Sequence, residues 1–331
     1  MGAARLVPGI SVGPPAESKF PGGKNGRCGY ALALQGGIAL MIKGYLKWLS
    51  PRLQMFTGAH ELNKGAAIAQ AAEYRQLKSL VAEKSPGNLA CSGFKVYSQN
   101  DEDGIIEEIF RRVGGDRTFL EIGVQTGVEC NSLYLLLKGW RGCWIEGNAR
   151  SVEAIGRTLG GTAFPPRFQA ISSFVTRGNI ASLYDQARSF VGAPEIDFFS
   201  LDIDGNDLHV MTDLLAAGAR PRIVCVEYQA KFPPPVSLTI RYADDHVWDE
   251  TDYMGSSLQA FVDLFAGHGY RLITCNIPGV NAFFAREDLT HHFPTLTVEQ
   301  LYQPFRNYLS PFGAPQPPSL GYLRDLLAST S

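Results

Sequence analysis

Acidic side chains stand at the ends of apolar stretches that have the length and composition of buried strands. Glu146 follows one such stretch in CWIEGN, Asp202 and Asp204 follow another in FFSLDIDGND, and Glu227 ends a third in IVCVEYQ. If these stretches are strands of a parallel sheet, their carboxyl ends share one edge. Carboxylates at such an edge can accept hydroxyl hydrogens, hold a hard divalent cation or take up a proton.

A glycine-containing turn precedes these acids in the chain. Residues 118–127 read TFLEIGVQTG, with Glu121 in the apolar run and Gly123 and Gly127 after it. Because glycine has no Cβ and takes positive φ, such a turn lets backbone approach a ligand. A dinucleotide-binding turn needs glycine where this chain has Gln125. The ExGxxxG spacing instead resembles motif I of the class I methyltransferases that use S-adenosylmethionine (SAM).

Glu146 lies 23 residues beyond Gly123, at the end of the second expected strand. A carboxylate there can accept both hydroxyls of a ribose as a bidentate pair. The alternative is a solvated strand-end residue with no ligand. The turn upstream favours ribose binding.

Asp202, Asp204 and Asp207 crowd into six residues. Carboxylates this close repel one another unless a cation, a positive substrate or a helix N-terminus offsets them. We expect Asp207 to start the next helix, Asp202 to reach a cofactor and Asp204 to face a different neighbour. Asp204 and Glu227 form the predicted catalytic pair, which either holds a metal such as Mg²⁺ or supplies a base.

The order of the elements predicts the sheet that positions these residues. Strands and helices alternate at a spacing that implies a parallel sheet with helices on both faces. Near the end, YRLITCN and NAFFAR are joined by too few residues for a parallel crossover, so they must pair antiparallel. A seven-stranded α/β sheet with one antiparallel strand is the Rossmann-like architecture of class I methyltransferases. The expected strands are 118–122, 142–146, 167–172, 196–203, 222–228, 270–276 and 281–286.

The flanks differ in composition from this block. Residues 1–40 are rich in Pro and Gly and are expected to be a disordered extension. Residues 41–93 are predicted to be a helical N-terminal segment, whose alanine-rich helix packs on a neighbour or on a second subunit of a homo-oligomer. Residues 94–290 form the expected catalytic domain. Residues 291–331 form a C-terminal tail with short helices at 297–309 and 319–330.

Composition limits the class of protein. The chain has 331 residues, 45% of them hydrophobic, with a net charge of −2 and a pI near 6.3. This balance gives no basic footprint for nucleic acid, and it favours an acidic or neutral small molecule or a glycan as acceptor. The six cysteines form no CxxC pair, which indicates reduced thiols and a cytoplasmic location. No apolar run is long enough to form a transmembrane segment.

Taken as ordered blocks, residues 95–288 resemble a family. YSQNDEDGIIEEIF, FLEIGVQTGVECNSLYLL, GCWIEGN, FFSLDIDGND, VCVEYQAKFPP and GVNAFF are similar to blocks of an uncharacterised group of bacterial SAM-dependent methyltransferases related to the FkbM type. The resemblance implies SAM as cofactor and O-methylation of a hydroxyl on a sugar, glycan or natural product. It carries over most of a SAM cradle, and the full predicted cofactor site is Glu121, Ile122, Gly123, Gly127, Glu146 and Asp202.

Two other functions remain open. Asp202-Ile203-Asp204 is a DxD after an apolar strand, as in metal-dependent glycosyltransferases, although ExGxxxG and Glu146 have no place in that interpretation. The second of these functions is that of a SAM-binding module that is catalytically silent. His246 is a possible general base, whereas His291-His292 has no third ligand at metal spacing and is expected to be solvated.

Overall fold

The computed structural model describes residues 59–160, 166–309 and 316–329. The chain divides into two compact units, Met1–Ala66 and Ala67–Ser331, and the second contains the sheet and the site described below. The predictions made for residues 1–40 and for residues 41–58 of the helical segment lie outside the described residues. No helix in the described ranges is long and apolar enough to cross a bilayer.

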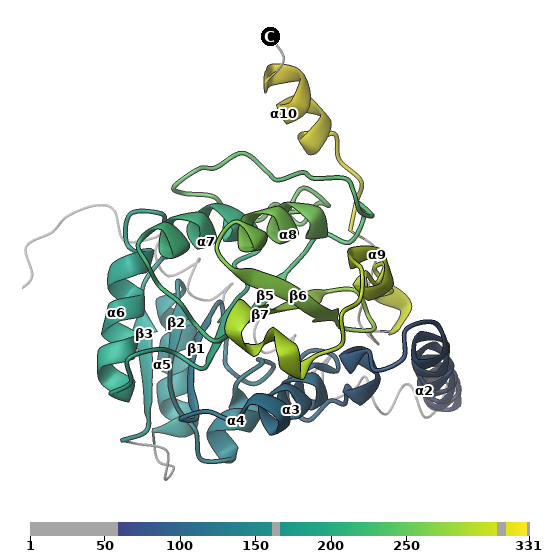
Figure 1. The fold of residues 1–331 in the computed structure, drawn as a ribbon, viewed down its shortest axis with the longest axis horizontal. Coiled ribbons are helices and arrows are strands. Elements are labelled where there is room, and N and C mark those ends of the chain that lie inside the picture. The colour runs from purple at the N-terminus through teal and green to yellow at the C-terminus, as the bar shows by residue number, and fades with distance from the viewer. Residues whose placement is uncertain (1–58, 161–165, 310–315, 330–331) are drawn as a thin grey trace, which may run out of the picture. The chain divides into compact units, whose positions relative to one another are not determined.

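The second unit is built around one seven-stranded sheet in the order β3-β2-β1-β4-β5-β7-β6. Neighbouring strands from β3 to β5 pair parallel, and β7 pairs antiparallel with both β5 and β6. The predicted sheet with one reversed strand is therefore confirmed (Figure 1). The strands are β1 (Thr118–Ile122), β2 (Arg141–Glu146), β3 (Phe168–Ser172), β4 (Phe198–Leu201), β5 (Ile223–Glu227), β6 (Tyr270–Cys275) and β7 (Asn281–Arg286).

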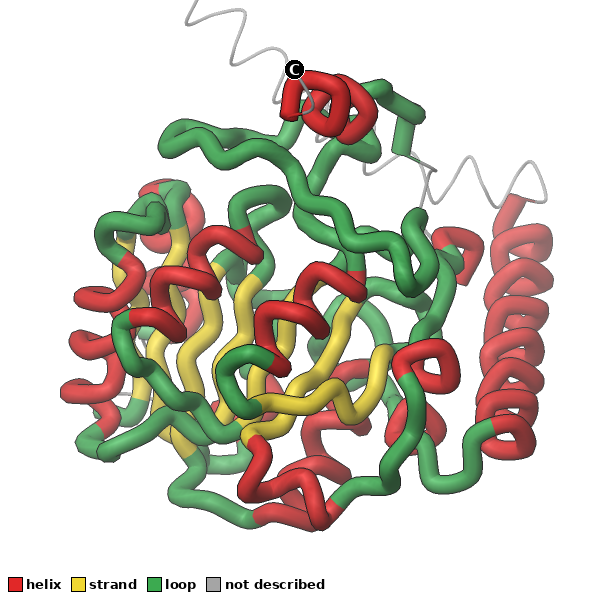
Figure 2. The backbone as a smooth tube through the Cα atoms, turned by 45° about the horizontal axis from the view of Figure 1, so that its top comes forward, coloured by secondary structure: helices red, strands yellow, loops and turns green. Residues whose placement is uncertain are grey.

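Helices cover both faces of this sheet (Figure 2). The alternation of side chains along β1 explains the two layers, because Leu120 and Ile122 pack into one buried core and Phe119 into the other. The first core includes α6 (Ile180–Val191), α7 (Asp207–Ala216) and α8 (Leu258–Ala266). The second includes α3 (Glu102–Val113), α4 (Leu133–Leu137) and α5 (Ala149–Leu159).

Several element boundaries differ from the predictions by one or two residues, and two further differences have a physical explanation. Strand β4 ends at Leu201, so that the acidic segment after it lies in a loop rather than in the strand predicted to reach residue 203. The helix predicted at 297–309 is wrong in its second half, because α9 (Val298–Leu301) stops before Pro304, whose ring is not accommodated inside a helix. The remaining elements are α2 (Ala59–Lys84), α10 (Gly321–Ser329) and the short 3₁₀ helices Leu89–Ser92, Glu287–His292 and Asn307–Leu309.

Candidate functional site

A cavity of about 230 Å³ lies at the carboxyl ends of β1, β2, β4 and β5. This is the edge at which open parallel sheets bind their ligands. All but one of the predicted site residues line the cavity: Glu121, Ile122, Gly123, Glu146, Asp202, Asp204 and Glu227. The exception is Gly127, which is not part of the wall.

Gly123 lines the cavity and has a positive φ in a place where only glycine fits. Its φ is +86°, and a Cβ on it would lie 1.6 Å from the carbonyl oxygen of Asp202. Its N–H donates to the carbonyl oxygen of Ile145 at 3.0 Å. The turn after β1 is thus packed between the ends of β2 and β4, where a side chain would separate the strands.

Gly127 and Gln125 shape the same turn in different ways. Gly127 has a φ of +73°, and a Cβ there would lie 2.3 Å from Cζ3 of Trp144, so this glycine lets the loop pack against an indole ring. Gln125 takes a left-handed φ of +51° without being glycine. Its N–H donates to Oε2 of Glu146 at 2.7 Å, and this contact supports the unusual backbone at the position where dinucleotide-binding turns have glycine.

Glu121 is buried and holds the loop that leads into α4. Its carboxylate accepts hydrogen bonds from the N–H groups of Asn131 and Ser132, both at 2.8 Å, and from Ser132 Oγ at 2.5 Å. Trp144 Nε1 donates in turn to Ser132 Oγ at 2.7 Å. Burial raises the pKa of Glu121, and these hydrogen bonds partly offset that effect. Glu121 therefore acts on any ligand through the loop that it fixes.

Glu146 is half-buried at the end of β2, and each of its oxygens accepts one backbone N–H. Oε2 binds Gln125 N at 2.7 Å and Oε1 binds Asn148 N at 2.8 Å. A carboxylate offers about four acceptor sites, so each oxygen can still accept a ligand hydroxyl. The two backbone contacts fix the orientation in which the carboxylate meets the cavity.

Asp202, Asp204 and Glu227 converge on one point of the wall. Each offers an oxygen, and these oxygens all lie within 4.8 Å of one another. We expected Asp202 and Asp204 to face different neighbours, and this expectation was wrong. The strand has already ended at Leu201, and Asp204 has a φ of +54°, so the backbone turns and brings the two carboxylates together.

The cluster is electrostatically strained. Burial, followed by repulsion from Asp204, raises the pKa of Asp202 well above its ordinary value, and burial with repulsion from Asp202 does the same for Glu227. Burial and the charge of Asp207 raise the pKa of Asp204 to about 6. Among the described residues that line the cavity there is no Lys or Arg to offset these three carboxylates, and only His246 lowers the pKa of Asp204.

Asp207 belongs to the scaffold rather than to the cavity. It is buried at the start of α7, where Oδ1 accepts from Ile203 N and Oδ2 from Gly205 N, both at 2.9 Å. Both oxygens thus tie the acidic loop to the helix. The predicted role of Asp207 as the start of this helix agrees with its position.

Several wall residues carried no sequence signal. Phe174, just after β3, is 47% exposed and presents its ring beside Gly147, whose Cβ would lie 3.2 Å from Phe174 Cδ2. Asn281 begins β7, pairs in register with Glu227, and donates from Nδ2 to Glu102 at 2.9 Å. These residues reach the cavity because strands and loops far apart in sequence are adjacent in the sheet.

His246 lies in the wall, on the long loop between β5 and α8. Its Nε2 is buried and has no hydrogen-bond partner in the described part of the chain. The ring packs on Gly205, where a Cβ would meet His246 Cδ2 at 2.2 Å. By contrast, His291 and His292 are exposed, contact each other with ring centroids 4.0 Å apart, and are not part of the cavity wall.

Comparison with solved structures gives distant likenesses. No protein-family model and no curated protein matches the chain. Among solved structures, an O-methyltransferase from Bacillus cereus in complex with SAH is 14% identical, over 63% of this chain and 89% of that one, with a TM-score of 0.38. The O-methyltransferase TomG from Streptomyces achromogenes, in complex with SAM, is 16% identical over 63% and 87%, with a TM-score of 0.37.

A third solved structure is the magnesium protoporphyrin IX methyltransferase from Synechocystis with bound SAH. It is 10% identical, over 56% of this chain and 81% of that one, with a TM-score of 0.38. Likeness at this level says nothing of what the present chain binds. The functional conclusion therefore rests on the strand order and on the residues of the cavity.

Proposed function

We propose that this protein is a SAM-dependent methyltransferase that transfers the methyl group to a hydroxyl of a sugar, glycan or natural product. One observation carries the proposal: a single cavity at the carboxyl edge of the sheet combines the Gly123 turn, the Glu146 carboxylate and the acidic cluster. The sheet order puts the first two at neighbouring strand ends, and the third at the next two strands.

The cavity fits SAM in three respects. Gly123 lines the cavity without a side chain, so the methionine part of a ligand can approach its backbone. Glu146 has acceptor sites left for ribose hydroxyls. The exposed ring of Phe174 offers a surface on which a planar base can stack. When bound, SAM supplies a methyl group activated by a sulfonium centre.

The chain itself has to align the acceptor and take its proton. Asp204 and Glu227 are our proposed residues for this step, and Asp202 joins them because its carboxylate lies in the same cluster. Either the three carboxylates hold a hard divalent cation such as Mg²⁺, or one of them accepts the proton directly. A bound cation would lower the pKa of the acceptor hydroxyl. Carboxylate oxygens are the ligands that Mg²⁺ prefers.

A ligand-stabilisation experiment tests the cofactor. Thermal unfolding is measured with SAM, SAH, NAD or UDP-glucose, each at increasing concentration. A ligand at 100 times its dissociation constant stabilises the folded state by about 2.7 kcal/mol. We expect SAM and SAH alone to stabilise. Stabilisation by UDP-glucose with Mn²⁺ but not by SAH would overturn the proposal in favour of the glycosyltransferase.

A second experiment separates the two roles of the acidic cluster. Transfer of labelled methyl from SAM is followed on a panel of sugars and glycans, with and without chelator. The metal mechanism predicts loss of transfer with chelator and recovery with added Mg²⁺ or Mn²⁺, whereas a direct base predicts no effect. Full activity of Asp204→Asn combined with Glu227→Gln would contradict the roles of these two residues in both versions. SAM binding with no transfer to any acceptor would indicate the catalytically silent module.

A further inference from the structure

The buried asparagines of this protein differ in how the amide oxygen is used. Among the described residues, Asn88 and Asn276 lie outside the cavity wall, whereas Asn131, Asn206 and Asn281 line the cavity. Asn88 and Asn276 each use Oδ1 within the chain, where it accepts two hydrogen bonds of 2.9–3.0 Å. This is the ordinary state of a buried amide, because buried polar atoms are almost always hydrogen-bonded.

The amide of Asn281 is oriented by a partner that can only accept. Glu102 is fully buried, and its carboxylate accepts from Nδ2 of Asn281 at 2.9 Å and from Nδ2 of Asn276 at 2.7 Å. It also accepts from Asn100 N at 2.9 Å. An ionised carboxylate has no hydrogen to donate, so the NH₂ group of Asn281 faces Glu102 and the oxygen faces away from it.

Oδ1 of Asn281 is therefore left as an acceptor in the cavity wall. The residue lines the cavity, and none of the described residues donates a hydrogen bond to this oxygen. Because an amide oxygen only accepts, the ligand atom that suits it is a hydroxyl or an N–H group.

Asn206 repeats this arrangement in the loop after β4. Its Nδ2 donates to the carbonyl oxygen of Ala243 at 2.7 Å, and a carbonyl oxygen again can only accept. Its Oδ1 is buried and has no partner in the described part of the chain. Asn131 differs, because its Nδ2 lies 3.1 Å from Ser200 Oγ, a group that can donate or accept and so does not fix the orientation of the amide.

Asn281 lies far from the proposed cofactor contacts along the sheet edge. Those contacts, Glu146 and Phe174, are at the ends of β2 and β3, and two strands separate β2 from β5. Asn281 begins β7 and is directly opposite Glu227 of β5. Side chains directly opposite each other on antiparallel strands have Cβ atoms about 4.5–5.5 Å apart. A small molecule whose reacting hydroxyl lies beside Glu227 can therefore reach Asn281 with a second hydroxyl.

We propose that the acceptor is polyhydroxylated and that Asn281 selects it, through a hydrogen bond from a second hydroxyl to Oδ1. This inference rests on the proposed function, because it concerns the second substrate of the same site. An acceptor with a single hydroxyl leaves this oxygen without a donor. A site built to bind a hydroxyl discriminates strongly against an analogue that lacks it, since a polar group of the site then stays unpaired.

Binding of sugars to the SAH complex tests the inference without requiring turnover. Glucose, galactose, mannose, fucose and rhamnose are titrated by ligand-observed NMR against the protein with saturating SAH and Mg²⁺. The sugar that binds most tightly is then compared with its monodeoxy derivatives. We expect at least one derivative to bind about tenfold more weakly or worse, because it leaves Oδ1 of Asn281 without a donor.

Asn281→Ala then identifies the group that recognises this hydroxyl. The variant should bind the parent sugar about tenfold more weakly, lose the discrimination against that one derivative, and keep its SAH affinity. Asn281→Ser keeps a donor for Glu102 and takes the place of the alanine variant if that variant does not fold. Asn88→Ala is the matched control, since Asn88 is buried to a similar extent but uses its oxygen within the chain and is not part of the cavity wall.

The outcomes separate the inference from the proposed function. Asn88→Ala should lose stability in thermal unfolding but discriminate among the sugars as the wild type does. An Asn281 variant that discriminates like the wild type overturns the inference, and so does a SAH complex that binds none of the sugars. Absence of SAH binding to the wild type instead overturns the proposed function, so the two failures are distinct.

Discussion

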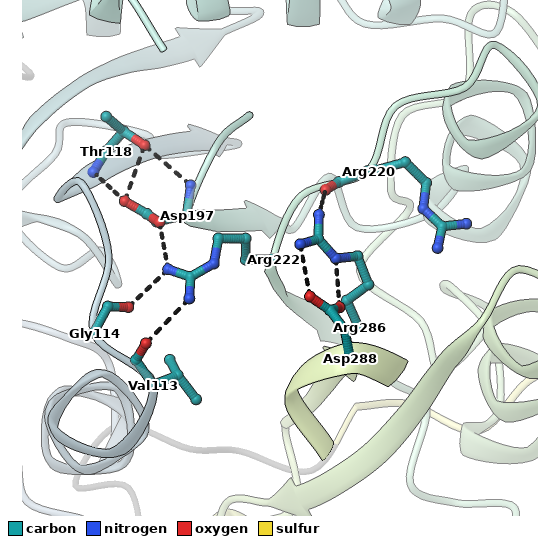
Figure 3. A network of polar contacts seen from close by, with 8 residues as sticks. All are labelled: Val113, Gly114, Thr118, Asp197, Arg220, Arg222, Arg286 and Asp288. Carbon is teal, nitrogen blue, oxygen red and sulfur yellow. Dashed lines mark hydrogen bonds and ion pairs between the residues drawn. The ribbon is translucent and has the colours of Figure 1, made fainter. Parts of the chain in front are cut away.

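The carboxylates at the two ends of strand β4 have opposite electrostatic surroundings. At the amino end, buried Asp197 accepts hydrogen bonds from Thr118 N at 3.0 Å, Thr118 Oγ1 at 3.2 Å and Arg222 Nη1 at 2.8 Å (Figure 3). At the carboxyl end, Asp202 lies with Asp204 and Glu227 in a wall that contains no Lys or Arg among the described residues.

This difference distinguishes charged side chains that stabilise the fold from charged side chains that are available to a ligand. Arg222 also donates to the carbonyl oxygens of Gly114 and Val113, so the Asp197 pair ties the end of α3 to β1, β4 and β5 (Figure 3). Every charge there has a partner inside the chain. The acids of the carboxyl end have no Lys or Arg beside them among the described residues that line the cavity, and burial followed by mutual repulsion raises their pKa values.

The largest effect on stability is expected from breaking the ion pair between Asp197 and Arg222 at the amino end of β4. Asp197→Ala should destabilise the fold by about 3–5 kcal/mol, because it leaves a guanidinium and the donors of Thr118 in a buried site without their acceptor. Urea unfolding at neutral pH measures the change. Asp185→Ala is the control, since its pair with Arg188 is exposed and is expected to contribute less than about 1 kcal/mol. Equal effects of the two variants would show that the Asp197 pair is not structural.

The second effect concerns the turn at Gly123, which lies at the same edge of the sheet as the acidic cluster. Gly123→Ala should destabilise by about 2–4 kcal/mol and remove SAH binding, because the added Cβ meets the carbonyl oxygen of Asp202 at a positive φ. Gly192→Ala separates the two causes. Gly192 has a φ of +64° but nothing within 4 Å of its Cβ position, so only the backbone strain of about 1 kcal/mol is expected. Thermal unfolding and SAH titration of both variants check this.

The third effect is on cofactor affinity. Glu146→Ala should weaken SAM binding by about 1.5–3 kcal/mol, or roughly 10- to 150-fold, through loss of a charged bidentate acceptor. Because Glu146 also accepts from Gln125 and Asn148, Glu146→Gln is the informative companion. It keeps one acceptor oxygen and should lose less affinity. Unchanged SAM affinity in folded Glu146→Ala would falsify the ribose role.

The sequence predicted the sheet because its information is local and periodic. Alternating apolar strands and helices, and the short connection between the last two strands, determine the strand directions without any knowledge of contacts. Gly123 and Glu146 could be placed in the site for the same reason, since both follow predicted strands.

The meeting of Asp202 with Asp204 could not be predicted in this way. It depends on the positive φ of Asp204, a conformation that aspartate adopts more often than most residues but only in a small minority of cases, so the residue type alone does not predict it. Phe174, Asn206 and Asn281 were missed because they reach the cavity only through segments that are brought together by the sheet. Sequence patterns thus located the edge at which a ligand binds, but not the complete wall around it.

The smallest effect, and the sharpest contrast with Asp197, is expected for Asp204→Asn. In the unfolded chain the aspartate ionises near its ordinary pKa of 3.8, whereas in the folded protein burial and Asp207 raise the pKa to about 6. As pH rises through this window the unfolded state loses its proton first, so the folded state loses stability and the full penalty persists above pH 6. An asparagine cannot ionise and avoids the penalty. With chelator and without SAM, Asp204→Asn should therefore be about 1–2 kcal/mol more stable than the wild type near pH 8, a value discounted for partial exposure. The variant should show no gain in stability near pH 3.5.

Urea unfolding at both pH values tests this prediction. A variant that is less stable than the wild type near pH 8 would mean that Asp204 has a compensating partner inside the chain, as Asp197 does.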